Sequence, residues 1–292
     1  MIKGSMVALI TPFHEDGSVN YEKLRELIEW HIEEKTDGIV VLGTTAETPA
    51  LTVTERDEIV RLSIEVAAGR VPIIVGSGSN NTLVAKEQSI KYEKMGADAL
   101  LVITPYYNKT NKAGMIQHFT EVANAVNIPI YIYNVPGRTG MSITYDVVEE
   151  ISKHRNIVAI KEASGDISFV AQISRLINEH FTVYSGNDDM IVPLMSLGGA
   201  GVISVLANIL PRQTHDMAMA YLEGDVELAK KLQLDYLEFI NNLFIETNPI
   251  PIKEAMNQMG MNVGGYRLPL CEMDPSTKAK LIDSMKRINL LK

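Results

Sequence analysis

Residues 99–133 contain two apolar runs, Ala99–Ile103 (ALLVI) and Ile130–Tyr133 (IYIY). A longer segment of mixed composition lies between them. Six further runs of this kind are Met6–Ile10, Gly38–Leu42, Pro72–Val75, Ile157–Ile160, Phe181–Ser185 and Gly201–Ser204. Most of them are continuously apolar, which is typical of parallel strands buried on both faces. They start about every 20 to 34 residues, the size of one strand–helix unit. The sequence therefore predicts eight such units.

The segments between these runs have the periodicity of helices. One apolar stripe at helical spacing consists of Leu24, Leu27, Ile28 and Ile32. Thr54 followed by Asp57 resembles a capping box at the start of a helix. Gly96 is placed to end the third helix in the left-handed conformation. Eight units can close into a ring without sheet edges, so we expect a (β/α)8 TIM barrel rather than an open sheet.

The alternation of strands and helices stops near residue 223. Glu223-Gly224-Asp225 interrupts the chain, and a single helical stripe is then expected from Leu228 to Leu243. Asn248-Pro249-Ile250-Pro251 is a further break, and a last helix is expected from Pro275 to Asn289. We therefore expect a barrel at residues 1–223 that carries the active site. An all-helical C-terminal appendage is expected at residues 224–292.

Composition excludes several classes of function. The 292 residues are 46% hydrophobic and 22% charged, as in ordinary soluble globular proteins. The net charge of −9 and the lack of a basic cluster argue against a nucleic-acid partner. No apolar run is long enough for a membrane span or a signal peptide, so no membrane partner and a cytoplasmic location are expected. Cys271 is the only cysteine, and the six histidines lack metal-ligand spacing, so no metal site is expected.

Two residues at predicted strand ends could carry chemistry, since TIM-barrel active sites lie at the carboxyl ends of the strands. Lys161 directly follows the run Ile157–Ile160. Partial desolvation there favours its neutral amine, which can form a Schiff base with a carbonyl compound. The alternative is a rim lysine paired with Glu162. Tyr133 shares a strand face with Tyr131 and could shuttle protons, or it could simply fill the barrel.

Other candidates are less specific. Thr44 and Tyr107 carry hydroxyls near neighbouring strand ends and could form a relay, although each also fits a loop residue with a local hydrogen bond. Arg138 lies in a Pro/Gly loop, where its guanidinium could bind a carboxylate through two parallel hydrogen bonds, or could be an ordinary surface group. Residues 198–201 (GGAG) resemble a phosphate cradle. They precede the eighth strand, on the opposite face from the catalytic mouth, so we interpret them as a tight turn.

The chain resembles the dihydrodipicolinate synthases. The motifs that carry the resemblance are Gly43–Glu47 (GTTAE), Tyr133–Gly140 (YNVPGRTG), Ile160–Gly165 (IKEASG), Gly201–Ser204 (GVIS), Gly4–Ala8 (GSMVA) and Asn248–Lys253 (NPIPIK). They cover essentially the whole chain. The resemblance implies a (β/α)8 barrel with a C-terminal helical domain, usually a homotetramer. It also implies condensation of pyruvate with L-aspartate 4-semialdehyde to 4-hydroxy-tetrahydrodipicolinate, on the route to diaminopimelate and lysine, without a metal or organic cofactor.

The resemblance further assigns roles to individual positions. It implies four catalytic residues, which are Lys161, Tyr133, Thr44 and Tyr107. It implies four substrate-binding positions, which are Thr45, Arg138, Gly186 and Ile203. Lys161 would form the Schiff base with pyruvate, and the three hydroxyls would relay protons, that of Tyr107 reaching in from a neighbouring subunit. Thr45 and the Ile203 backbone would hold the pyruvate part near Gly186, and Arg138 would bind the carboxylate of the semialdehyde.

One departure from the family and several rival functions remain open at this point. The family usually has a glycine where this chain has Ala46, and a positive φ there would make alanine cost about 1 kcal/mol or more. N-acetylneuraminate lyases and keto-deoxy sugar-acid aldolases share the lysine and the tyrosine but generally lack an arginine at position 138. A barrel that has lost catalysis would not need to keep all four of Lys161, Tyr133, Thr44 and Tyr107. A metal-dependent aldolase would need clustered histidines and carboxylates.

Feedback inhibition by lysine, which occurs in some family members, is not expected in this protein. Lysine-inhibited family members bind lysine in a cleft between subunits, which maps here onto Thr48, Pro49, Val53, Arg56, Asn80, Val84 and Tyr106. Asn80 and Tyr106 match the inhibited pattern. Those members have histidines at the positions of Val53 and Arg56 and a glutamate at that of Val84. Because valine removes the counter-charge for the ligand ammonium group, we expect insensitivity to lysine.

Overall fold

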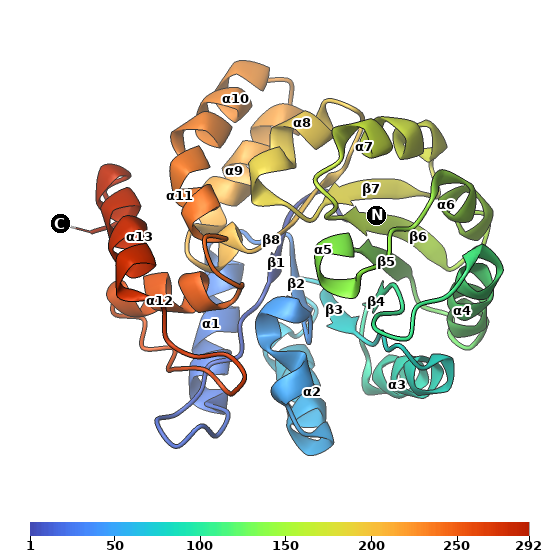
Figure 1. The fold of residues 1–292 in the computed structure, drawn as a ribbon, viewed down its shortest axis with the longest axis horizontal. Coiled ribbons are helices and arrows are strands. Elements are labelled where there is room, and N and C mark those ends of the chain that lie inside the picture. Colours follow the sequence, from blue (N-terminus) through green and yellow to red (C-terminus); the bar gives the residue numbers. More distant parts are fainter. Residues whose placement is uncertain (292) are drawn as a thin grey trace.

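A closed barrel of eight parallel strands forms the centre of the molecule, in the computed structural model that describes residues 1–291. The strands follow one another around the barrel in sequence order. They are β1 (Gly4–Ala8), β2 (Gly38–Val41), β3 (Ile73–Gly76), β4 (Ala99–Ile103), β5 (Ile130–Asn134), β6 (Ile157–Glu162), β7 (Thr182–Ser185) and β8 (Gly201–Ser204). Figure 1 shows the helices surrounding them. The predicted fold class is confirmed.

Helices connect the strands and continue beyond the last one. They are α1 (Tyr21–Glu33), α2 (Val53–Ala67), α3 (Thr82–Met95), α4 (Lys112–Asn124), α5 (Pro136–Thr139), α6 (Tyr145–Ile151), α7 (Ile167–Ile173), α8 (Ile191–Met195), α9 (Pro211–Leu222), α10 (Val226–Asp235), α11 (Leu237–Asn242), α12 (Ile250–Gln258) and α13 (Pro275–Arg287). Within the described part of the chain, no helix is both long and apolar enough to span a membrane.

Side chains on the two faces of each strand belong to different apolar layers. The outward-facing residues pack against the surrounding helices in the main core. The inward-facing residues fill the barrel, and among them are Met6, Val40, Ile74, Leu101, Tyr131, Tyr133, Tyr184 and Ile203. Tyr131 and Tyr133 thus share the inner face, as the alternation of the strand predicts. This double burial explains why most of the strand sequences are continuously apolar.

The barrel closes between β1 and β8, where Gly4 pairs with Gly201. A Cβ atom at Gly201 would lie 1.8 Å from the backbone oxygen of Gly4, and Gly201 has a φ of 146°. Only glycine fits this position. Gly201 also ends the tight turn that links α8 to β8, so the interpretation of residues 198–201 as a turn is confirmed. β1 therefore begins at Gly4, two residues before the predicted start.

Two local predictions about helices are wrong. The capping box of α2 is formed by Thr52 and Glu55, not by Thr54 and Asp57, because α2 begins at Val53 and Glu55 then occupies its third position. The stripe expected from 228 to 243 is divided between α10 and α11 at Tyr236. α10 packs on α9 whereas α11 packs on α13, so the two segments need different directions.

The C-terminal segment differs from the expectation in one further element. The predicted break at residues 248–251 contains a cis peptide bond between Asn248 and Pro249. A helix that was not predicted, α12, starts directly after it at Ile250. α11, α12 and α13 stand together along one edge of the molecule (Figure 1). Gly96 ends α3 in the left-handed conformation, as predicted.

Candidate active site

Lys161 lies inside the barrel near the carboxyl end of β6. Its register partners are Tyr133 on β5 and Tyr184 on β7. The residue is 5% exposed, and its Nζ atom lies 4.5 Å from the centre of the Tyr133 ring. Burial lowers the pKa of Lys161 to about 8, although the carboxylate of Asp188 raises it in part. A substantial fraction of neutral, nucleophilic amine is therefore present near neutral pH.

Glu162 follows Lys161 but points to the opposite face of the strand. It accepts hydrogen bonds from Nδ2 of Asn134 at 2.7 Å and from the backbone N–H of Ser164 at 2.6 Å. Because adjacent strand residues face opposite sides, the two side chains cannot pair. The alternative that Lys161 is a rim residue paired with Glu162 is therefore wrong.

Tyr133 lies between Lys161 and the loop that follows β2. Its side chain is buried, and burial raises the pKa of its phenol. The neighbouring side chain of Thr44 and the nearby charge of Arg138 both lower that pKa. A phenol poised between a lysine and a second hydroxyl can pass a proton in either direction. The structure thus brings Lys161, Tyr133, Thr44 and Arg138 together.

A cavity of about 400 Å³ opens beside these residues. Its lining includes Thr44, Tyr133 and Arg138, together with Arg56 and Val84. Lys161 does not line this cavity itself, but its amine lies over the ring of Tyr133, which does. The barrel mouth thus offers a space of the size of a small ligand.

Gly186 keeps space for the lysine. A Cβ atom there would lie 3.0 Å from Cε of Lys161 and 2.6 Å from Cβ of Ala163. Its backbone N–H donates to the oxygen of Glu162 at 2.7 Å, which fixes the β7 end against β6. Ile203 on β8 is fully buried in the barrel interior. Both predicted substrate-binding positions therefore lie in the barrel, and Gly186 is next to Lys161.

The loop Gly43–Glu47 forms a short 3-10 helix, η1, over Thr44–Ala46. Thr45 is buried, and its Oγ1 accepts a hydrogen bond from Nδ2 of Asn248 at 3.0 Å. Positive φ occurs at Glu47, with a φ of 55°, and not at Ala46. The strain considered for alanine at position 46 is therefore absent.

Arg138 and Tyr107 sit in very different surroundings. Arg138 lies on α5, and its Nη2 donates to the backbone oxygen of Asn248 at 2.9 Å. Tyr107 is 92% exposed on the loop after β4 and has a φ of 68°. Within this single chain the structure does not bring Tyr107 to the other predicted residues. Its neighbour Tyr106 lines the cavity.

Asp188 is a candidate that sequence reasoning missed. It is almost fully buried and accepts hydrogen bonds from Oγ of Ser204 and from the backbone N–H groups of Val205 and Leu206. Burial raises its pKa and these bonds lower it. Its carboxylate favours the charged form of Lys161. The sequence shows that Asp188 follows the seventh strand. It does not show which way the side chain of Asp188 points.

Asn248 is a second missed residue. Its side chain contacts Thr45 and its backbone contacts Arg138. Its Oδ1 atom is buried without a hydrogen-bond partner among the described residues. The sequence motif Asn248–Lys253 marked the position, but no periodicity connects it with residues 45 and 138. Asn248 joins the C-terminal segment to two predicted site residues.

Fold and site together define a (β/α)8-barrel protein with a desolvated lysine near the carboxyl end of β6, beside a buried tyrosine. A model of the dihydrodipicolinate synthetase family matches residues 1–288. The chain belongs to this family.

Individual relatives match the chain from end to end. The 4-hydroxy-tetrahydrodipicolinate synthase of Clostridium perfringens (strain SM101 / Type A) is 54% identical over 292 residues, which is 100% of both chains. The crystal structure of dihydrodipicolinate synthase from Aquifex aeolicus is 43% identical, with a TM-score of 0.96, over 99% of this chain and 98% of the other. The synthase from Cyanidioschyzon merolae, solved with lysine bound, is 37% identical, with a TM-score of 0.96, over 99% of each chain.

Proposed function

We propose that the protein is a 4-hydroxy-tetrahydrodipicolinate synthase, which condenses pyruvate with L-aspartate 4-semialdehyde. The observation that carries the proposal is the desolvated amine of Lys161 beside Tyr133. Membership of the family and the name of the 54% identical relative support it. They do not support the alternative, a lyase or aldolase acting on sugar acids. The reaction belongs to the diaminopimelate route to lysine, and we propose a cytoplasmic location.

The proposed chemistry begins with attack of the neutral Lys161 amine on the keto carbon of pyruvate. Loss of one water gives a Schiff base, and removal of a methyl proton gives an enamine. The enamine carbon attacks the aldehyde of the semialdehyde. The amino group of the second substrate then attacks the imine carbon, which closes the ring and releases Lys161. No metal or organic cofactor is needed, because protonated nitrogen serves as the electron sink.

The other residues take the roles of proton transfer and binding. Tyr133 and Thr44, which are neighbours in the cavity lining, move protons during formation of the Schiff base and the enamine. Thr45 and the backbone of Ile203 hold the pyruvate part, close to Gly186. Arg138 binds the carboxylate of the semialdehyde.

The test of this function is a coupled assay of the purified protein with both substrates. The cyclic product is detected through its reduction by an added dihydrodipicolinate reductase. Formation of this product supports the proposal. The same protein is incubated with N-acetylneuraminate and with keto-deoxy sugar acids. Turnover of one of these without condensation of the semialdehyde would favour the alternative instead.

Arg138→Ala should weaken use of the semialdehyde far more than reaction with pyruvate. A charge-assisted pair with a carboxylate contributes roughly 1.5 to 3 kcal/mol, so kcat/KM for the semialdehyde should fall about 10- to 100-fold. Borohydride trapping with pyruvate alone should stay near the wild-type rate. Equal damage to both measurements would contradict this role. Arg155→Ala, on the loop before β6, is the control.

The site is proposed to be completed in a homotetramer, by Tyr107 of a neighbouring subunit. Tyr107 is 92% exposed and Tyr106 is 37% exposed, and adjacent tyrosines are a composition that interfaces favour. Sedimentation of the purified protein should give a tetramer, and Tyr107→Ala should lower both assembly and turnover. Full activity in a monomer would refute a required contribution from the neighbour.

Lysine should not inhibit the enzyme at ordinary cellular concentrations. Arg56, Val84 and Tyr106 line the same cavity as Thr44. An apolar side chain at position 84 leaves the ligand ammonium without a counter-charge, and even about 3 kcal/mol would weaken binding roughly a hundredfold. Initial rates are measured with lysine up to the millimolar range. Partial inhibition below millimolar lysine would contradict the prediction, and Val84→Glu should introduce inhibition.

A further inference from the structure

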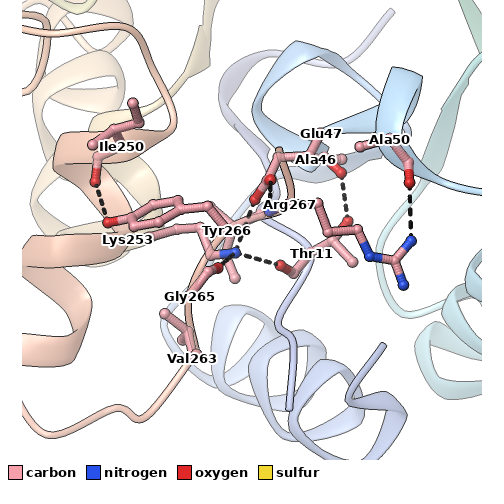
Figure 2. A network of polar contacts seen from close by, with 12 residues as sticks. Thr11, Ala46, Glu47, Ala50, Ile250, Lys253, Val263, Gly265, Tyr266 and Arg267 are labelled. Atoms are coloured by element: carbon pink, nitrogen blue, oxygen red, sulfur yellow. Dashed lines mark hydrogen bonds and ion pairs between the residues drawn. The ribbon is translucent and has the colours of Figure 1, made fainter. Parts of the chain in front are cut away.

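Glu47 connects the loop that carries Thr44 to the C-terminal segment. Its backbone has a φ of 55°, and its N–H donates to the oxygen of Thr44 at 3.1 Å. Its Oε1 atom accepts from Nζ of Lys253 at 2.8 Å, and its Oε2 atom accepts from the backbone N–H of Arg267 at 3.1 Å. Figure 2 shows both partners converging on this carboxylate. Both carboxylate oxygens are therefore used by the C-terminal segment.

Lys253 is completely buried, and its ammonium group has no free donor. Besides Glu47 it donates to the backbone oxygens of Thr11, at 3.1 Å, and Gly265. An ammonium group has three N–H donors, so its hydrogen bonds are complete. The rings of Phe13 and Tyr266 flank Nζ, with centres at 4.3 and 5.3 Å. This closed environment fixes the direction of the amine.

Three successive residues of the loop are held from outside it. Asn248 contacts Thr45, the Thr11 hydroxyl donates to the oxygen of Ala46 at 2.7 Å, and Lys253 pairs with Glu47. Lys253 also contacts Thr11 itself, so it secures two of these three attachments. Thr44 directly precedes these three residues, and its side chain is close enough to Tyr133 to lower the pKa of the phenol, while both residues line the same cavity. A shift of the loop would therefore change the Thr44–Tyr133 distance.

We propose that the Glu47–Lys253 ion pair is a positioning device that sets the rate of proton transfer at Tyr133 by holding the Thr44 loop. Neither residue contacts the reacting atoms. A buried ion pair contributes little net stability compared with an apolar pair of equal volume, so stability alone does not account for it. The directional hydrogen bonds that the pair makes between distant segments of the chain do account for its presence. The inference rests on the proposed function, since proton transfer at Tyr133 matters only in that reaction.

The test compares proton transfer with Schiff-base formation in Glu47→Gln. Lys253 and the Arg267 backbone donate to different oxygens of Glu47, and in glutamine one of these two positions is an NH2 group, which donates and does not accept, so one of the two contacts is lost. Exchange of the pyruvate methyl protons with D2O is followed by NMR, and active sites are counted by borohydride trapping. The exchange rate per trapped site should fall about a hundredfold, because a misplacement of a catalytic group by about 1 Å can lower the reaction rate by that factor. The affinity for pyruvate should change little.

Two further variants separate positioning from stability. The double variant E47Q/K253M leaves no unpaired buried ammonium, so it covers the case in which Glu47→Gln does not fold. It should show the same loss of exchange. Met256→Ala removes a buried side chain on α12 outside the network. It should lower the melting temperature while exchange per trapped site stays at the wild-type rate.

The outcomes distinguish the two proposals. Wild-type protein that traps no pyruvate would refute the proposed function. Wild-type protein that traps and exchanges, together with folded Glu47 variants that exchange at the wild-type rate per site, would overturn the positioning role. The same conclusion would follow if Met256→Ala lowered exchange per site as strongly as the Glu47 variants.

Discussion

Lys161→Ala should abolish covalent capture of pyruvate and lower kcat by about 10³-fold or more, because we propose its amine as the covalent catalyst. After incubation of wild-type protein with pyruvate and borohydride, mass mapping should locate the added group on Lys161 alone. Capture should increase as pH rises through about 8, since burial lowers the pKa of Lys161 to that value and the neutral amine is the nucleophile.

The matched control for this variant is Lys153→Ala. Lys153 is an exposed lysine, paired only with Glu150 on the surface, so its removal should leave capture and turnover unchanged. Circular dichroism should show that Lys161→Ala retains the barrel. Modification of a different lysine in the wild type, or capture that persists in Lys161→Ala, would show that the nucleophile is wrongly assigned.

Tyr133→Phe should lower kcat by about 10²- to 10⁴-fold, the usual contribution of a positioned general acid–base group. The phenyl ring retains the contact with Lys161, so the Schiff base should still form and be trapped, although more slowly. The variant also loses the hydroxyl that faces Thr44. The measurement is turnover beside borohydride capture in one preparation.

A neighbouring tyrosine offers the control for Tyr133→Phe. Tyr131 faces the same barrel interior two residues earlier, and its ring lies 5.5 Å from that of Tyr184. Tyr131→Phe should leave kcat within a few-fold of the wild type. If both tyrosine variants lost activity equally, the role of Tyr133 would be packing and not proton transfer.

The sequence was sufficient to predict the barrel, because each strand is buried on both faces and repeats at a regular spacing. The sequence also marked Lys161 and Tyr133 as candidates at strand ends, and the structure places both side chains inside the barrel. Their mutual contact is set by the strand register, which pairs Tyr133 with Lys161. The apolar periodicity within one segment does not determine which residues of two strands are paired.

The remaining features depend on contacts between distant segments. Glu47 and Lys253 are 206 positions apart, and Thr45 and Asn248 are 203 positions apart. No local pattern indicates such pairs. The misplaced capping box has a different reason: positions 52 and 54 both offer a threonine followed at i+3 by an acidic residue, and only the observed helix start distinguishes them.

The attachment of the Thr44 loop to Lys253 also determines when a growing chain acquires its catalytic geometry. Strand β8 ends at Ser204, so a ribosome completes the barrel sequence well before it adds Lys253 and Arg267. Until then Glu47 has neither of its partners. A polypeptide released after the eighth strand would contain Lys161 and Tyr133 but not the restraint on Thr44. Maturation of the active site is thereby a late event of synthesis, coupled to the last quarter of the chain.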